Sequence, residues 1–156
     1  MNDDSVLRAA MLGGMSGLRS IAGVAAVSNG LAEHPERASG PLQRTLARPL
    51  VVRALTLAAV GECVADKLPM IPPRIDPIPL TGRVTLGALA ALAGARRQRD
   101  SRLAAAVIGG ATALGAAFLA YYLRRDLTRH GTRDPVVAIT EDLTVLEAAR
   151  QSMHAL

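Results

Sequence analysis

Aromatic side chains are nearly absent from this sequence: they make up 2% of its 156 residues, and there is no Trp. Half of the residues are nevertheless hydrophobic, so any core must consist largely of Ala, Leu, Val and Gly. Small residues are what helix packing in lipid favours, because the backbones of neighbouring helices approach closely there. The scarcity of rings therefore favours a membrane bundle over a water-soluble core.

The residues and motifs of most cofactor and metal chemistry are also missing. Cys63 is the only cysteine, so no internal disulfide can form. The three histidines, His34, His130 and His154, are scattered through polar segments, which does not fit a zinc site. The chain contains no nucleophile-elbow motif, no phosphate loop and no dinucleotide fingerprint. We therefore expect neither an enzyme nor a bound metal or cofactor.

The positive charge is carried almost entirely by arginine, and Lys67 is the only lysine in a chain of net charge +5. Basic chains can bind nucleic acid. Here, however, the arginines lie mostly at the ends of apolar blocks and no stacking aromatics accompany them, so we expect no nucleic-acid partner. The first residues, MNDDSVLR, are acidic where a secretory signal is basic, so the first apolar block is expected to be kept as structure.

The apolar blocks predict an all-α protein, a polytopic membrane helical bundle with multiple passes through the cell membrane. Residues 103–123 carry no charge and have no polar face to show to water, which disfavours the alternative of a soluble helical bundle. We expect a loop over 33–48, with room for one surface turn of helix, and no regular helix between the prolines of 69–79. The expected membrane-embedded helices cover about residues 9–31, 50–67, 80–95 and 103–123, followed by an amphipathic C-terminal helix at about 140–152.

The segment Val51–Pro69 carries acids inside an apolar helix. Glu62 and Asp66 are four residues apart, so their carboxylates stack on one helix face. Each ionised group near a bilayer centre costs about 2.5–3.5 kcal/mol on insertion scales. We therefore expect both carboxylates to face the protein interior, with Arg19 or Lys67 within salt-bridge range of at least one.

The charged residues of the apolar blocks and the tail form one candidate site. Mutual neutralisation in a packed bundle is one interpretation. The other, which we favour, is a site for an ion, a proton or a small charged solute in a transporter or channel. A non-transporting scaffold or assembly factor is the alternative function. Arg19 is expected to be buried and paired, whereas Arg83 fits an interface or a site equally well. The candidate residues are Arg19, Glu62, Asp66, Lys67, Arg83, Glu141 and Asp142.

Residues 7–18 align with residues 103–114, with Gly13 opposite Gly109, although chance is a serious alternative in a chain so rich in Ala, Gly and Leu. If four helices span, the two copies run in opposite directions, which is an inverted repeat. On that topology equal numbers of Arg and Lys lie inside in either orientation, so the positive-inside rule does not decide the orientation. Such a balance suits dual insertion and a homo-oligomer, with an antiparallel dimer favoured.

Four stretches together resemble a family of small bacterial integral membrane proteins known only as a domain of unknown function. They are GGMSGLRS (13–20), GECVADKLP (61–69) with Arg74 after it, TGRVTLGAL (81–89) and TEDLTVL (140–146). The resemblance implies a membrane location and brings no established reaction or substrate. It implies signature positions at Arg19, Glu62, Asp66, Lys67, Pro69, Arg74, Arg83, Glu141 and Asp142.

Overall fold

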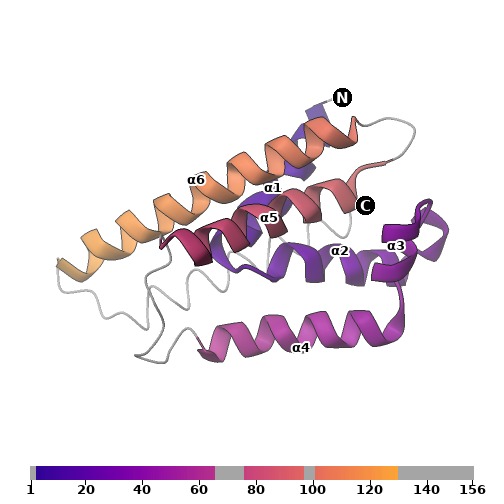
Figure 1. Cartoon of the computed structure of the whole chain (residues 1–156), viewed down its shortest axis with the longest axis horizontal. Coiled ribbons are helices and arrows are strands. Elements are labelled where there is room, and N and C mark those ends of the chain that lie inside the picture. The colour runs from indigo at the N-terminus through magenta and orange to yellow at the C-terminus, as the bar shows by residue number, and fades with distance from the viewer. Residues whose placement is uncertain (1–2, 66–75, 97–100, 130–156) are drawn as a thin grey trace.

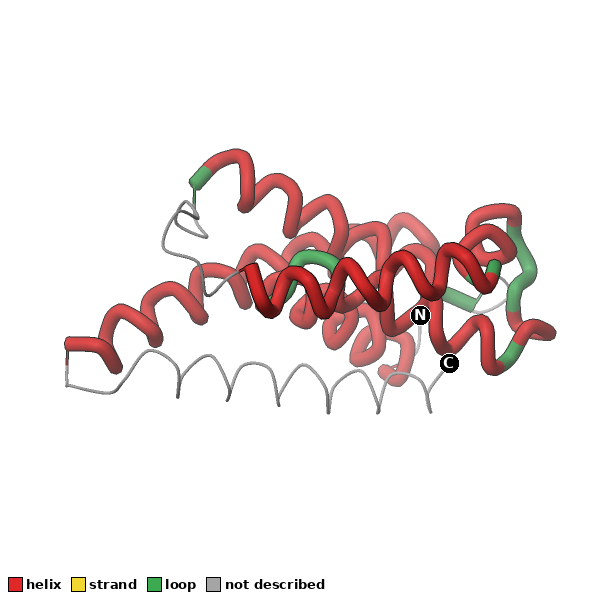
Figure 2. The backbone as a smooth tube through the Cα atoms, turned by 90° about the horizontal axis from the view of Figure 1, so that it is seen from below, coloured by secondary structure: helices red, strands yellow, loops and turns green. Residues whose placement is uncertain are grey.

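The computed structural model describes residues 3–65, 76–96 and 101–129, and within these ranges the chain forms helices joined by short loops, with no strand (Figure 2). The predicted all-α class is confirmed for this part of the chain. The helices are α1 (Asp3–Leu18), α2 (Ala22–Glu33), the 3-10 helix η1 (Pro35–Arg37), α3 (Pro41–Leu46), α4 (Pro49–Ala65), α5 (Pro77–Gly94) and α6 (Arg102–Arg129) (Figure 1).

The predicted single helix over residues 9–31 is wrong, because the chain turns between α1 and α2. A methyl group on Gly23, in the first turn of α2, would meet the carbonyl oxygen of Leu12 and the hydroxyl of Ser16. In one straight helix, residues 12 and 23 lie about 16 Å apart. The helix α2 therefore folds back along α1, as a hairpin. Hydropathy missed the turn because both arms are apolar and the groups that compensate the broken backbone come from distant segments.

The helices α1, α5 and α6 pack together through glycines that let their backbones touch. A methyl group on Gly13 would collide with the carbonyl oxygen of Gly109, and one on Gly17 would collide with that of Ala113. A methyl group on Gly87 would lie 2.6 Å from the Cβ of Ala113. This is the close backbone approach that the small-residue composition predicts.

The same contacts fix the direction of the helices. The α6 partner moves from Gly109 to Ala113 as the α1 residue moves from Gly13 to Gly17, so α1 and α6 run parallel. The inverted relation expected between residues 7–18 and 103–114 is therefore wrong. A four-span topology has three reversals of chain direction between the first and last helices. The turn between α1 and α2 adds a fourth reversal, so α1 and α6 run the same way.

The helix α2 lies between α4 and α5, and α4 packs against α2 (Figure 1). Its residues Val51 and Leu55 pack against the main core, to which Leu12, Val27 and Leu46 belong. Other apolar side chains of α4 are exposed, and Leu50 and Leu57 keep 80% and 72% of their surface. The apolar contact of α4 with the bundle is thus one stripe of its surface, which includes Val51 and Leu55 and is called the α4 stripe below.

Several predicted boundaries change. The predicted loop over 33–48 contains η1 and α3, and α6 continues six residues beyond the predicted end at 123. Pro77 and Pro79 do not prevent a helix, because they lie in the first turn of α5, where a missing N–H breaks no intrahelical bond. For the predicted helix 50–67, the described part is α4, ending at Ala65; the tail helix at 140–152 lies outside the described residues.

Among the described residues, one helix is long and apolar enough to cross a membrane by length and composition. It covers Arg102–Leu123 of α6, with a mean hydropathy of 2.0, and 28% of it is buried.

The glycine contacts predict opposite effects at two adjacent positions. Gly13→Ala forces a methyl group into the backbone of α6 and should lower the free energy of unfolding by about 1–3 kcal/mol. Gly14→Ala meets nothing within 4 Å and should leave stability unchanged or raise it by up to about 1 kcal/mol, since Ala favours helix. Denaturant titration of the two purified variants measures both. Equal stability of the two would contradict the packing described here.

Candidate functional site

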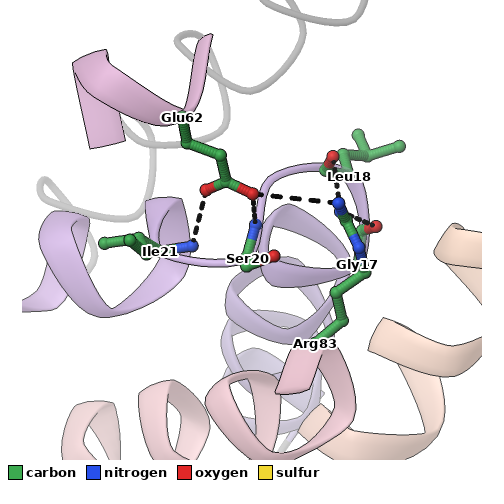
Figure 3. Close-up of polar contacts among 6 residues, drawn as sticks. All are labelled: Gly17, Leu18, Ser20, Ile21, Glu62 and Arg83. Carbon is green, nitrogen blue, oxygen red and sulfur yellow. Dashed lines mark hydrogen bonds and ion pairs between the residues drawn. The ribbon is translucent and has the colours of Figure 1, made fainter. Parts of the chain in front are cut away.

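The turn between α1 and α2 is closed by the carboxylate of Glu62 from α4 (Figure 3). The backbone N–H of Ser20 donates to Oε1 of Glu62 at 2.7 Å. The backbone N–H of Ile21 donates to Oε2 at 3.0 Å. These donors lie at the start of α2, where a helix has unsatisfied N–H groups and a partial positive charge. Glu62 therefore caps α2 from another segment of the chain.

The guanidinium of Arg83 in α5 closes the other side of the same turn. Its Nη1 donates to the carbonyl oxygens of Gly17 and Leu18, at 3.0 and 2.9 Å. These carbonyls end α1, where the helix dipole favours a cation. Nη2 of Arg83 lies 3.8 Å from Oε1 of Glu62, so the two caps also form an ion pair (Figure 3). The carboxylate of Glu62 thus faces the positive start of α2, and the guanidinium of Arg83 faces the negative end of α1. The two charged groups also face each other.

Burial makes these contacts matter. The side chain of Arg83 is 5% exposed and that of Glu62 is 14% exposed. Removing one partner from such a pair leaves a poorly solvated charge, which typically costs about 3–5 kcal/mol when burial is complete. The slight exposure of Glu62 means that one edge of its side chain lies open at the surface of the bundle.

Two further polar residues of α1 and the turn are buried close by. Arg19, the first residue of the turn, is 2% exposed. Ser16 lies one helical turn before Ser20 and is fully buried. Its hydroxyl lies against Gly23 in the first turn of α2 and has no hydrogen-bond partner among the described residues. The turn therefore holds a hydroxyl donor that the described fold does not use.

The structure brings together three of the seven candidate residues. Glu62 faces the interior as expected, and Arg19 and Arg83 are both buried at the turn. The described ion pair of Glu62 is with Arg83. The expected pairing of Arg19 or Lys67 with Glu62 or Asp66 involves residues outside the described ranges and stays a prediction. Four candidates lie outside the described residues: Asp66, Lys67, Glu141 and Asp142.

Sequence reasoning missed that half of the site is backbone. The N–H groups of Ser20 and Ile21 and the carbonyls of Gly17 and Leu18 have no signature of their own. The one available signal was the run Gly17–Ser20, where a small residue, an arginine and a serine interrupt an apolar block.

A second polar contact, also missed, closes the opposite end of the bundle. Gln43 of α3 is 4% exposed, and its Nε2 donates to the carbonyl oxygens of Ala93 and Ala95 at the end of α5. Its Oε1 accepts the backbone N–H of Gly40 at the start of α3. Gln43 therefore joins the end of α5 to the start of α3, where a polar loop was expected.

The described residues contain no group of three or more His, Cys, Asp or Glu side chains that could hold a metal ion. A shallow apolar groove of about 500 Å³ runs along the outer face of α5, lined by Pro77, Ile78, Thr81, Gly82, Thr85 and Leu86. Neither Glu62 nor Arg83 lines this groove, so it is separate from the charge pair.

The charge pair predicts a strong coupling between its two members. Arg83→Met removes the donors to Gly17 and Leu18 and leaves Glu62 without its ion pair, which should cost about 3 kcal/mol or more of stability. The double variant with Glu62→Gln should lose less than the sum of the two single losses, by about 1–3 kcal/mol. Denaturant titrations of wild type, the two single variants and the double variant give the coupling energy between Arg83 and Glu62. Arg44→Met, at an exposed position, is the control and should stay within about 0.5 kcal/mol. Additive losses would show that the pair acts as two independent caps.

Comparison with known proteins gives a family and no established activity. No match was found among the curated proteins or among the solved structures. A family model described as a domain of unknown function (DUF4126) matches residues 6–155. That match covers nearly the whole sequence, and the chain therefore belongs to this family.

Proposed function

We propose that the protein is a small multi-pass integral membrane protein that transports an ion or a small charged solute. The membrane assignment is supported first by α6, whose apolar stretch Arg102–Leu123 is only 28% buried and lies far from the N-terminus. A core helix of a soluble protein would be mostly buried. Exposed apolar side chains continue on α4, at Leu57, Val60 and Val64. An exposed apolar surface of this kind suits a lipid environment.

The observation that carries the transport proposal is the depth of the α1–α2 turn. Gly17, just before the turn, lies against Ala113 and Ala116, close to the middle of the stretch 102–123. That stretch is about 33 Å long, which matches the hydrocarbon core of a bilayer. The turn and its charge pair would thus lie near the midplane. Discontinuous helices whose ends meet at the midplane form the ion and substrate sites of many transporters.

The hairpin also gives the protein a preferred orientation. The arginine end of the bundle comprises η1, α3, the end of α5 and the start of α6; Gln43 joins α3 to α5 there, and Arg102 lies beside Gly40. Its exposed arginines are Arg37, Arg44, Arg48, Arg96 and Arg102. With a hairpin in place of one span, the N-terminal part of α1 also lies at this end. Arg8 moves to the arginine end, so the equal counts that suggested dual insertion become unequal by two, and the positive-inside rule favours the arginine end in the cytoplasm.

A scaffold or assembly factor is the rival function, and one observation favours it. Both oxygens of Glu62 are already hydrogen-bonded to the turn, so the charge pair would hold a hairpin in lipid even without a solute. Exposed arginines at one end would then bind anionic lipid or a partner.

The orientation is tested by labelling single cysteines in a Cys63→Ser background. Glu36→Cys lies at the arginine end and Asp126→Cys lies beyond the apolar stretch of α6, and both positions are exposed. An impermeant maleimide should label Asp126→Cys in intact cells, and should label Glu36→Cys only after permeabilisation. Labelling of both cysteines from the same side would show that the chain does not cross the membrane an odd number of times between residues 36 and 126. Labelling of Glu36→Cys alone in intact cells would contradict the proposed orientation.

Transport is tested by flux into proteoliposomes across a panel of cations, anions and protons. Wild-type protein should carry at least one of them. Glu62→Gln should lower that flux about tenfold or more, because a neutral amide cannot close the turn again after the solute leaves, and a charged hydrogen bond there is worth about 1.5–3 kcal/mol. Glu36→Gln, fully exposed at the arginine end, is the matched control and should leave flux unchanged. Flux equal to that of empty liposomes, with folded wild-type protein present, would favour the scaffold.

A further inference from the structure

We propose that the α1–α2 turn is a carboxylate-binding site, filled by Glu62 in the resting protein and by the carboxylate of the transported solute when α4 moves away. This inference rests on the proposed function and names its substrate class. It means that Glu62 acts as an internal competitor of the solute.

The chemistry of the cradle carries the proposal. All the described groups that contact the Glu62 carboxylate are donors or cations: the N–H groups of Ser20 and Ile21, and the guanidinium of Arg83. Such a set binds an anion with two oxygens and repels a cation. The turn is therefore a poor cation site in either state, and a complete carboxylate site once Glu62 leaves.

The hydroxyl of Ser16, in the last turns of α1, is a further polar group that Glu62 does not bind. It lies against the first turn of α2, is fully buried, and has no hydrogen-bond partner among the described residues. A buried hydroxyl left without a partner is a net cost to the resting structure.

The fold allows Glu62 to leave without unfolding the bundle. Glu62 is carried by α4, which is attached through one stripe, whereas Gly17, Ser20 and Arg83 belong to the glycine-packed helices and their turn. Its side chain is 14% exposed, so the cradle is already open at one edge. Outward movement of α4 would open the cradle and keep its donors in place.

The test is chemical rescue of a protein that lacks the internal carboxylate. Glu62→Ala should melt at a lower temperature than wild type in sodium chloride. In sodium acetate at the same ionic strength its melting temperature should rise by at least about 2 °C, since a ligand that binds only the folded state stabilises it. Wild type, whose cradle is filled, and the surface control Glu36→Ala should show no acetate-specific rise. The double variant with Arg83→Met should lose the rescue.

If Glu62→Ala does not fold in chloride, recovery of folded protein from acetate and not from chloride is the same result. Aggregation in both salts, or a melting temperature that does not respond to acetate, would overturn the proposal. Flux is measured separately with labelled acetate as the probe. Rescue without any flux in wild type would keep the carboxylate site and remove transport. Flux of a cation or proton, with no rescue, would keep transport and remove the carboxylate class.

Discussion

The structure depends on satisfying the backbone where α1 ends and α2 begins. A helix end leaves carbonyls and N–H groups without partners, and where that end is buried they must find partners within the protein. Arg83 satisfies the carbonyls of Gly17 and Leu18, and Glu62 satisfies the N–H groups of Ser20 and Ile21. Since the two caps carry opposite charges 3.8 Å apart, neither is left as an isolated ion. Two charged residues that look expensive in an apolar helix are thus what stabilises the hairpin.

The positions of the two caps require tight packing elsewhere. Arg83 reaches Gly17 only if α5 lies close to α1, and that distance is set by the glycines of the three-helix contact. Gly87 of α5 lies one turn beyond Arg83 and is the point at which α5 meets both α1 and α6. Gln43 anchors the far end of the same helix through Ala93 and Ala95. The helix α5 is therefore held at Arg83, at Gly87 and at its C-terminal end, which keeps the guanidinium in register with the turn.

The sequence predicted the elements that depend on local patterns. The all-α class and the position of α6 follow from apolar blocks, and the burial of Glu62 and Arg19 follows from the cost of exposing charge to an apolar environment. The hairpin could not be predicted, because hydropathy is continuous across Arg19 and the compensating groups lie over 40 residues away in Glu62 and over 60 away in Arg83. The error in α5 was different: prolines were read as breakers, although a first helical turn accepts them. One missed turn then reversed every later direction, which is why the expected repeat was inverted and the helices are parallel.

A cap and a solute site need not be alternatives at this turn. The buried N–H groups of Ser20 and Ile21 need a hydrogen-bond acceptor, so withdrawing Glu62 without a replacement is costly. Exchange of Glu62 for the carboxylate of a solute replaces each hydrogen bond by an equivalent one, and the net change at the turn is small. The cost of opening is then mainly the separation of the α4 stripe around Val51 and Leu55 from the core. In the proposed exchange, this need for an acceptor at the turn would make movement of α4 dependent on a replacement carboxylate, which is the coupling that a carrier needs and a fixed scaffold does not.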